Sequence, residues 1–242
     1  MVGPKTVEAG GAASVPLVSI VRLSGVVALL GRFPALAGID LEVGPREIVL
    51  VQGPNGAGKS TLLRLCAGLL RPESGKAEVL GHDLSVHRAA VRRSVGLLGH
   101  DTALYDDLSV VENLRFWAVA SRVDGAGVGP AMDRLGLPSR LHDVAVGKLS
   151  AGQRRRVALA AVVVRRPQLW LLDEPHAGLD QSGRDLVDQL VTDAAAAGAT
   201  VMLASHELDR TVDLATRHVT VAGGTITSDR PGEGGRGVED VL

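Results

Sequence analysis

The chain has 242 residues, a formal net charge of −1 and a hydrophobic content of 45%. This length suits one domain, or a core with one inserted subdomain, and the near-neutral charge argues against a general nucleic-acid surface. The single cysteine, Cys66, excludes an internal disulfide and a multi-cysteine zinc site, and we expect it to be a buried thiol. With no visible signal peptide and no apolar run of the ~18 residues that span a membrane, a soluble cytoplasmic protein is expected.

The N-terminal part of the chain carries strand patterns that lead into a glycine-rich loop. Residues 1–14 are rich in Gly and Ala, and a loose tail is expected there. Alternating apolar positions predict antiparallel strands over 16–22 and 38–43. The apolar run 48–51 predicts a buried strand directly before the loop.

Residues 53–60 read Gly-Pro-Asn-Gly-Ala-Gly-Lys-Ser, between that strand and an amphipathic helix. This is the Walker A pattern in its structural context: the glycines let backbone N–H groups face phosphate oxygens, and the helix start adds its positive dipole. Lys59 supplies a point charge for the β- and γ-phosphates, and Ser60 a hydroxyl for Mg²⁺. The predicted ATP-binding residues are Gly53, Pro54, Asn55, Gly56, Ala57, Gly58, Lys59, Ser60 and Thr61.

The helix after the loop is predicted to end before the breaker cluster that begins at Arg71. Its apolar face is predicted to hold Leu62, Leu63, Cys66, Leu69 and Leu70. Short strands are predicted over 77–80 and 95–98. His82 and His87 lie in a polar linker, and we interpret them as solvated surface residues.

The segment 104–165 is predicted to be helical. Ser109 and Glu112 form a capping box that opens a helix running through Trp117. Two further helices are predicted over 130–135 and 151–164.

The βα alternation then resumes. Strands are predicted over 169–172 and 200–204, with a helix over 184–197 between them and a hairpin turn at Gly223-Gly224. Residues 229–242 are expected to be a disordered tail. This order predicts an α/β fold with a mostly parallel, helix-covered sheet that is interrupted by a helical insertion.

Two carboxylates follow the apolar strand that begins at Leu169. Asp173 at the strand tip suits a contact with Mg²⁺, and Glu174 is placed to orient and deprotonate an attacking water. A strand that merely ends in solvated acids is the alternative, and the Walker A loop upstream makes it much weaker.

A second possible phosphate site lies at 149–153, which read Leu-Ser-Ala-Gly-Gln. Ser150 and Gln153 form a capping box, so an ordinary helix start is one interpretation. A helix N-terminus led by Ser and Gly is also an anion site, by the same physics as the first loop.

Together these motifs resemble the ATP-binding cassette (ABC) ATPases, and similar landmarks extend from about 17 to 227. In that family a Leu-Ser-Gly-Gly-Gln signature closes on ATP held by the other subunit. The resemblance therefore implies that Ser150, Ala151, Gly152 and Gln153 act in trans, with Ala151 replacing the first Gly of the signature. It also implies a D-loop ending at Asp180. His206 matches the switch histidine that contacts the γ-phosphate, although a lone His is otherwise more often a core residue.

Two positions depart from the general ABC pattern. Gly99-His100 stands where most cassettes carry a Gln, and Leu30 stands where an aromatic residue usually stacks on adenine. Phe33 is the nearest aromatic candidate to replace it. Gly99-His100, the Ala form of the signature and Leu169-Trp170 are similar to the haem-exporter ATPase family of cytochrome c maturation.

The resemblance implies an ABC nucleotide-binding domain over 15–228, with a P-loop NTPase core, an antiparallel β lobe and a helical subdomain at about 100–165, between flexible tails 1–14 and 229–242. Catalysis would rest on Glu174 and His206, with ATP and Mg²⁺ (held by Ser60 and Asp173), and His100 would contact the membrane partner. The expected partners are a second cassette, in a homodimer or a paired assembly, and a separate transmembrane permease at the cytoplasmic face of the membrane, without nucleic acid. Haem export, export of a drug or lipid, and a non-transport role in translation or DNA metabolism remain as alternatives.

Overall fold

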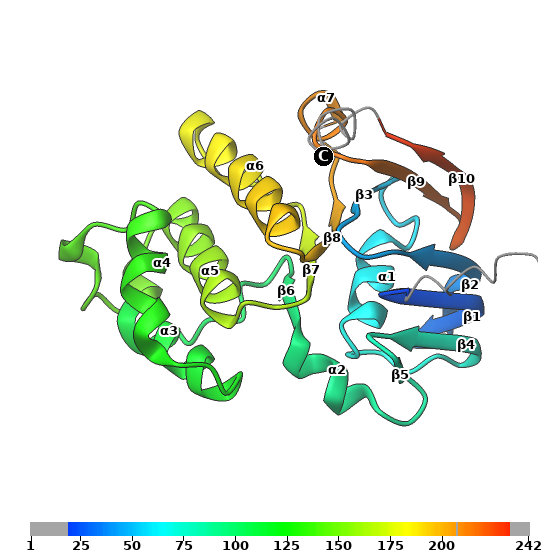
Figure 1. Ribbon diagram of the computed structural model, residues 1–242, viewed down its shortest axis with the longest axis horizontal. Helices are drawn as coiled ribbons and strands as arrows, with labels where there is room; N and C mark the ends of the chain where they lie inside the picture. The colour runs from blue at the N-terminus through cyan, green and yellow to red at the C-terminus, as the bar shows by residue number, and fades with distance from the viewer. Residues whose placement is uncertain (1–18, 207, 233–242) are drawn as a thin grey trace, which may run out of the picture.

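The computed structural model describes residues 19–206 and 208–232, in three parts (Figure 1). A six-stranded sheet lies at the centre, a smaller antiparallel sheet packs on one side, and helices α3, α4 and α5 form a lobe on the other side. Helix α1 (Lys59–Cys66) lies between the two sheets and contacts both. The predicted tail 1–14 lies outside the described residues, as does 233–242.

The central sheet has the strand order β10-β9-β3-β8-β7-β6. Its neighbours pair in parallel except for β9 and β10, which are antiparallel. Strands β7 and β8 are buried along their whole length because both faces of the sheet are covered, which explains their nearly unbroken apolar sequences. The predicted α/β fold is therefore confirmed. The strands are β3 (Ile48–Gln52), β6 (Val95–Leu98), β7 (Leu169–Asp173), β8 (Thr200–Ala204), β9 (Arg217–Ala222) and β10 (Thr225–Pro231).

The antiparallel sheet has the order β2-β1-β4-β5. Its strands are β1 (Val21–Leu30), β2 (Phe33–Val43), β4 (Ser74–Val79) and β5 (His82–Asp83). The bounds of the strand predicted over 16–22 were wrong: 16–18 lie outside the described residues, and the first described strand begins at Val21 and continues to Leu30 before turning at Gly31. Register shifts between Leu23 and Val26 break the two-residue alternation of buried positions, so the strand pattern is hard to see in the sequence.

Helix α1 ends at Cys66, earlier than predicted. Gly68, with φ of 69°, reverses the chain, and its N–H donates to the Leu65 carbonyl at 2.8 Å. Leu69 therefore does not belong to the buried face that was predicted for it, and it is 49% exposed. Cys66 is buried as predicted, and burial raises the pKa of its thiol to about 12, so the thiol is unreactive at neutral pH.

The helical lobe consists of α3 (Val110–Ala120), α4 (Val128–Arg134) and α5 (Ala151–Arg165), joined by the 3₁₀ turns η1 (Gly125–Gly127), η2 (Ser139–Leu141) and η3 (Val146–Lys148). Both predicted capping boxes, at Ser109 and at Ser150, are present. Helix α2 (Arg88–Ser94) was not predicted, because it buries only Val91 and so has no apolar stripe. The remaining helices are α6 (Gln181–Ala196) and α7 (Leu208–Thr211).

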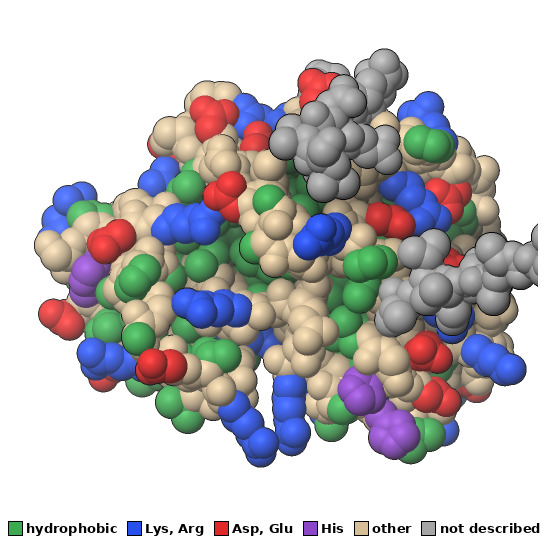
Figure 2. Space-filling view, viewed as in Figure 1, with side chains coloured by type: hydrophobic (Ala, Val, Ile, Leu, Met, Phe, Trp, Pro, Cys, Tyr) green, Lys and Arg blue, Asp and Glu red, His purple; other side chains and the backbone are tan. Residues whose placement is uncertain are grey.

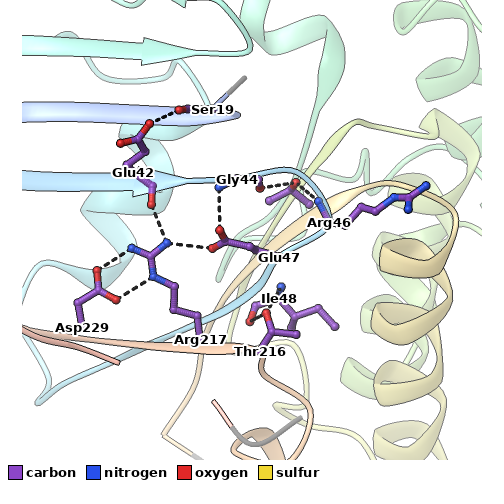
Figure 3. A network of polar contacts seen from close by, with 10 residues as sticks. Ser19, Glu42, Gly44, Arg46, Glu47, Ile48, Thr216, Arg217 and Asp229 are labelled. Atoms are coloured by element: carbon purple, nitrogen blue, oxygen red, sulfur yellow. Dashed lines mark hydrogen bonds and ion pairs between the residues drawn. The ribbon is translucent and has the colours of Figure 1, made fainter. Parts of the chain in front are cut away.

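The C-terminal strand continues past the point where a disordered tail was predicted. Arg217 on β9 donates to both carboxylate oxygens of Asp229 at 2.8 and 2.7 Å, to Glu47 Oε2 at 3.0 Å and to the Glu42 carbonyl at 2.7 Å (Figure 3). This network joins β10 to the turn between β2 and β3, far away in the sequence. The boundary between 228 and 229 was therefore wrong, because β10 continues through Asp229.

Positive and negative side chains intermingle over the face shown in Figure 2, in keeping with the net charge of −1. None of the helices within 19–206 and 208–232 has the length and apolarity that crossing a bilayer requires.

Candidate nucleotide-binding site

The loop between β3 and α1 adopts a conformation that depends on its glycines. Gly53 has φ of 141°, and a Cβ there would lie 2.0 Å from the Val221 carbonyl oxygen. Gly58 has φ of 111°, and a Cβ there would lie 2.6 Å from the Ala35 carbonyl oxygen. Any side chain at either position would therefore force the backbone to move, and the loop could not keep its N–H groups turned inward.

Lys59 is the first residue of α1 and is only 7% exposed. Its ammonium donates to the carbonyls of Gly53 at 2.7 Å and Pro54 at 3.1 Å, which holds the side chain across the loop. Helix α1 has no side-chain cap at Gly58, so the N–H groups of its first turn have no side-chain acceptor of that kind. A lysine ammonium beside an uncapped helix start is an arrangement that binds phosphate.

A cavity of about 340 Å³ opens beside this loop. It brings together the loop, the carboxylates after β7 and the segment after β6, although these lie far apart in the sequence. The residues that line it are Leu30, Ala35, Asn55, Gly56, Ala57, Gly58, Lys59, Ser60, Thr61, Arg64, His100, Asp173 and Glu174. A larger cavity of about 570 Å³ lies between α4, α5 and α6, but the phosphate-binding loop and both carboxylates are in the smaller one.

Asp173 ends β7 in a buried position, and Ser60 lines the same cavity from α1. A hydroxyl and a carboxylate are the oxygen ligands that Mg²⁺ takes from a protein when phosphates and waters complete its shell. Within the described residues no three His, Cys, Asp or Glu side chains form a metal cluster. Ser60 and Asp173 are therefore suited to hold a Mg²⁺ that neutralises phosphate charge.

Glu174 lies at the edge of the cavity with an unusual backbone conformation, φ of 49°. Its N–H donates to the Ala204 carbonyl at 2.8 Å, and its Oε2 lies 2.7 Å from Nδ1 of His206. The side chain of His206 is 68% exposed and meets the carboxylate from the end of β8. The two residues predicted to be catalytic are thus in direct contact, and a strained backbone of this kind is common at functional sites.

Arg155 on α5 was not singled out from the sequence, although it contacts the main chain of the site. It is 6% exposed and donates to the carbonyls of Asp173 at 2.7 Å and Gly99 at 2.8 Å. Burial lowers the pKa of its guanidinium, while the nearby Asp173 and Glu174 charges oppose that change. Arg155 precedes the buried Ala158 and Leu159 at helical spacing, but Arg154 and Arg156 also precede buried residues at this spacing, so the sequence did not distinguish Arg155 from them.

The signature segment (149–153) does not reach the cavity of its own chain. Ser150 is exposed, its hydroxyl accepts from the Gln153 N–H at 3.3 Å, and its own N–H donates to Gln153 Oε1 at 3.0 Å. Ala151 is also exposed, and a Cβ on Gly152 would lie 3.0 Å from the Gly178 carbonyl oxygen, so the segment packs beside the predicted D-loop.

Asp180 caps helix α6 from the end of this D-loop. Its carboxylate accepts from the Gly183 N–H at 2.9 Å and from Arg156 at 3.0 Å. These hydrogen bonds, the one from Gly183 first, lower the pKa of Asp180. The D-loop is therefore joined to α5 through an ionised carboxylate.

The two positions that depart from the general pattern both line the cavity. His100 is exposed and follows β6, and Leu30 is 45% exposed at the end of β1. Phe33 is 80% exposed and is not among the lining residues, whereas Leu30 is the largest apolar side chain that lines the cavity. His82 and His87 are exposed, as predicted.

Strand β3 of a parallel sheet leads through a glycine-rich loop into α1, and Asp173 ends β7, which is two strands away from β3 in the sheet. This arrangement defines a P-loop nucleoside triphosphatase. The family model for ABC transporters matches residues 36–177. Among solved structures, an ATP-binding subunit of an ABC transporter aligns with a TM-score of 0.82 at 24% identity, covering 88% of this chain and 90% of that one. A dimeric ATP-binding cassette in a post-hydrolysis state with ADP and Pi aligns with a TM-score of 0.78 at 22% identity, covering 87% and 98%.

Two kinds of curated relative are similar to this chain. The cytochrome c biogenesis ATP-binding export protein CcmA of Sphingopyxis alaskensis is 38% identical over 187 residues, which are 77% of this chain and 90% of that protein. The daunorubicin/doxorubicin resistance ATP-binding protein DrrA of Streptomyces peucetius is 36% identical over 222 residues, which are 86% of this chain but only 64% of that protein. The chain therefore belongs to the ABC transporter family, as an ATP-binding, ATP-hydrolysing subunit.

Proposed function

We propose that this protein hydrolyses ATP to drive export through a separate membrane subunit, at the cytoplasmic face of the membrane. The observation that carries this proposal is the single cavity that joins the phosphate loop to Asp173 and Glu174. Binding and hydrolysis of a nucleoside triphosphate require both sets of groups within reach of the same phosphates.

The residues around the cavity divide the chemistry among them. Lys59 would exchange its loop carbonyls for phosphate oxygens, and Ser60 and Asp173 would hold a Mg²⁺ that supplies positive charge against the phosphates. Glu174 accepts a proton from the attacking water. His206, 2.7 Å from Glu174, orients that carboxylate and reaches toward the γ-phosphate.

The signature segment acts on a second subunit in this proposal. Its start, Ser150, is exposed and outside the cavity of its own chain, so a cassette facing it could present ATP there. Two copies related by a two-fold axis would each complete the site of the other. The solved cassette in a post-hydrolysis state has the same fold and is a dimer, which is compatible with such an assembly.

The surface around His100 is the proposed contact with the membrane subunit. Tyr105, Phe116 and Val119 are 50%, 40% and 77% exposed, and the Tyr105 and Phe116 rings meet edge to face at 4.8 Å. Apolar side chains exposed together mark an interaction surface more often than scattered ones do. A helix of the membrane subunit resting here would lie next to the segment that leads from His100 into the nucleotide cavity.

Haem export for cytochrome c biogenesis is the proposed cargo function. It is supported by Gly99-His100 and by the similarity to the cytochrome c biogenesis export protein of Sphingopyxis alaskensis over 90% of its length. Export of another cargo, such as a drug, is the second candidate because the daunorubicin/doxorubicin resistance proteins are similar to a comparable degree. A non-transport role has no comparable support among these relatives.

The test is to purify the full chain with the membrane subunit that accompanies it and to reconstitute the pair in lipid vesicles. Stimulation of ATP hydrolysis by haem, and not by an anthracycline, is the expected result. Stimulation by the anthracycline alone would replace haem with a drug as cargo. A chain that hydrolyses ATP but never associates with a membrane subunit would contradict the transport function itself.

A further inference from the structure

Arg155 makes hydrogen bonds to two separate segments of the site at once. Its side chain comes from the first turns of α5 and donates to the Gly99 carbonyl at 2.8 Å, just before His100. It also donates to the carbonyls of Asp173 at 2.7 Å and Glu174 at 2.5 Å, with a longer contact to the Pro175 carbonyl at 3.5 Å. One buried guanidinium therefore joins the signature helix to both walls of the nucleotide cavity.

The partners of this guanidinium are main-chain carbonyls. An arginine placed only to neutralise charge would be expected to face a carboxylate, whereas here the rigid fork of N–H groups fixes the path of two chain segments. One of these segments contains Glu174, whose φ of 49° needs support from its surroundings to persist. Bonds to the carbonyls of Asp173 and Glu174 supply that support on both sides of the strained residue.

We propose that Arg155 is a positioning residue that fixes the main chain of Glu174 and the Gly99–His100 segment relative to the signature helix. A shift of α5, produced when the signature segment meets a second subunit, would then reach the base and the membrane contact of the same chain. The inference rests on the proposed role of Glu174, and Arg155 itself touches no reacting atom. A side chain with one donor group cannot bridge the two segments in this way.

The chain offers a matched control in Arg165, at the other end of the same helix. Arg165 donates to the Val95 carbonyl at 2.8 Å and the Arg92 carbonyl at 3.1 Å, and lies 5.1 Å from the centre of the Trp117 ring. Burial lowers the pKa of Arg165 as it does that of Arg155. It is therefore a half-buried arginine that, like Arg155, donates to main-chain carbonyls, together with the Ser121 hydroxyl at 2.9 Å, and it does not line the nucleotide cavity.

The experiment compares Arg155→Met, Arg155→Lys and Arg165→Met in the full chain, by thermal unfolding, ATP affinity and kcat. Arg155→Met should lower kcat by about 10- to 100-fold, the usual scale for a misplaced catalytic group, while ATP affinity stays within about twofold. Arg155→Lys should recover part of the loss, because one ammonium can hold one of the two segments. Arg165→Met should lose a similar amount of thermal stability and keep kcat near that of the wild type.

Equal kcat in Arg155→Met and Arg165→Met, at equal thermal stability, would overturn the proposal and leave Arg155 a structural residue. If Arg155→Met does not fold, Arg155→Lys decides: wild-type kcat in that variant contradicts positioning by the fork. Glu174→Gln, measured alongside, separates the two levels of the argument. If that variant hydrolyses ATP normally, the role of Glu174 fails, whereas an inactive Glu174→Gln with an unaffected Arg155→Met removes only this inference.

Discussion

The start of helix α1 and the start of helix α5 are both suited to bind phosphate, but they differ in what surrounds them. Around α1, Lys59, Ser60, Asp173 and Glu174 share one cavity of about 340 Å³ within a single chain. At α5, Ser150 is exposed and is already engaged in its own capping box. At the start of α1, the same chain supplies the groups that line the cavity. We expect the start of α5 to gain a function only when another subunit brings phosphate to it.

The largest effect is expected from removing the proposed base beside the start of α1. Glu174→Gln should lower turnover by about 10²–10⁴-fold, because the amide keeps the shape of the side chain but cannot accept a proton. ATP binding should survive, and the variant should accumulate as an ATP-bound dimer on gel filtration. Glu73→Gln, an exposed position, serves as the control. Near-wild-type hydrolysis by Glu174→Gln would show that Glu174 is not the base.

The second substitution breaks the other helix start. Ser150→Arg places a bulky cation on the exposed end of α5 and should abolish turnover, on a scale of about 10²-fold or more for a lost phosphate contact in the transition state. The ATP affinity of the monomer, measured at low protein concentration, should not change. Ser139→Arg makes the same change at another exposed serine of the helical lobe and should be silent. A large loss of monomer affinity in Ser150→Arg would place this residue in the site of its own chain.

A smaller effect is expected from the loop backbone. Gly58→Ala adds a Cβ 2.6 Å from the Ala35 carbonyl oxygen at φ of 111°. If the resulting strain is about 1–3 kcal/mol, ATP affinity should fall about 5- to 150-fold. Gly129→Ala is the control, because nothing lies within 4 Å of a Cβ there. Unchanged affinity in Gly58→Ala, measured by equilibrium nucleotide binding, would show that the loop tolerates another backbone path.

The smallest expected effect concerns His100. His100→Gln should keep activity at neutral pH within about threefold, far from the loss caused by removing a base. The glutamine carbonyl oxygen can accept a hydrogen bond as a neutral imidazole nitrogen does, so the acceptor at this position is kept. The measurement is kcat of each protein at neutral pH. A loss much larger than threefold would show that His100 has a role that a glutamine cannot fill.

The same contrast explains how far the sequence could lead. The phosphate loop and the acidic strand end were predictable because each lies on one short segment, between a buried strand and a helix. The capping box at Ser150 was equally local, and the structure contains it. The distances between these motifs in the fold depend on the strand order of the sheet. A local sequence pattern does not give that order.

Each incorrect prediction has a physical cause in the structure. The strand around Asp229 looks like a polar tail, but it pairs with β9 and is bonded to Arg217 on that strand, which in turn bonds to the distant Glu42 and Glu47. The first strand was misplaced because bulges interrupt its alternation, and Leu69 was misplaced because Gly68 turns the chain. Arg155 was overlooked in a run of three arginines, because each of them precedes buried residues at helical spacing and only the fold shows which one is buried.

The most direct test of the account is to mix the two inactive variants. Glu174→Gln retains a working signature segment, and Ser150→Arg retains a working base, so a mixed dimer has one complete site. In an equal mixture half of the dimers are mixed, and the activity should recover to about one quarter of the wild-type rate if the two sites are independent. No recovery, with mixed dimers demonstrated by gel filtration and pull-down, would mean that Ser150 and Glu174 serve the same chain, and would contradict the division between the two helix starts.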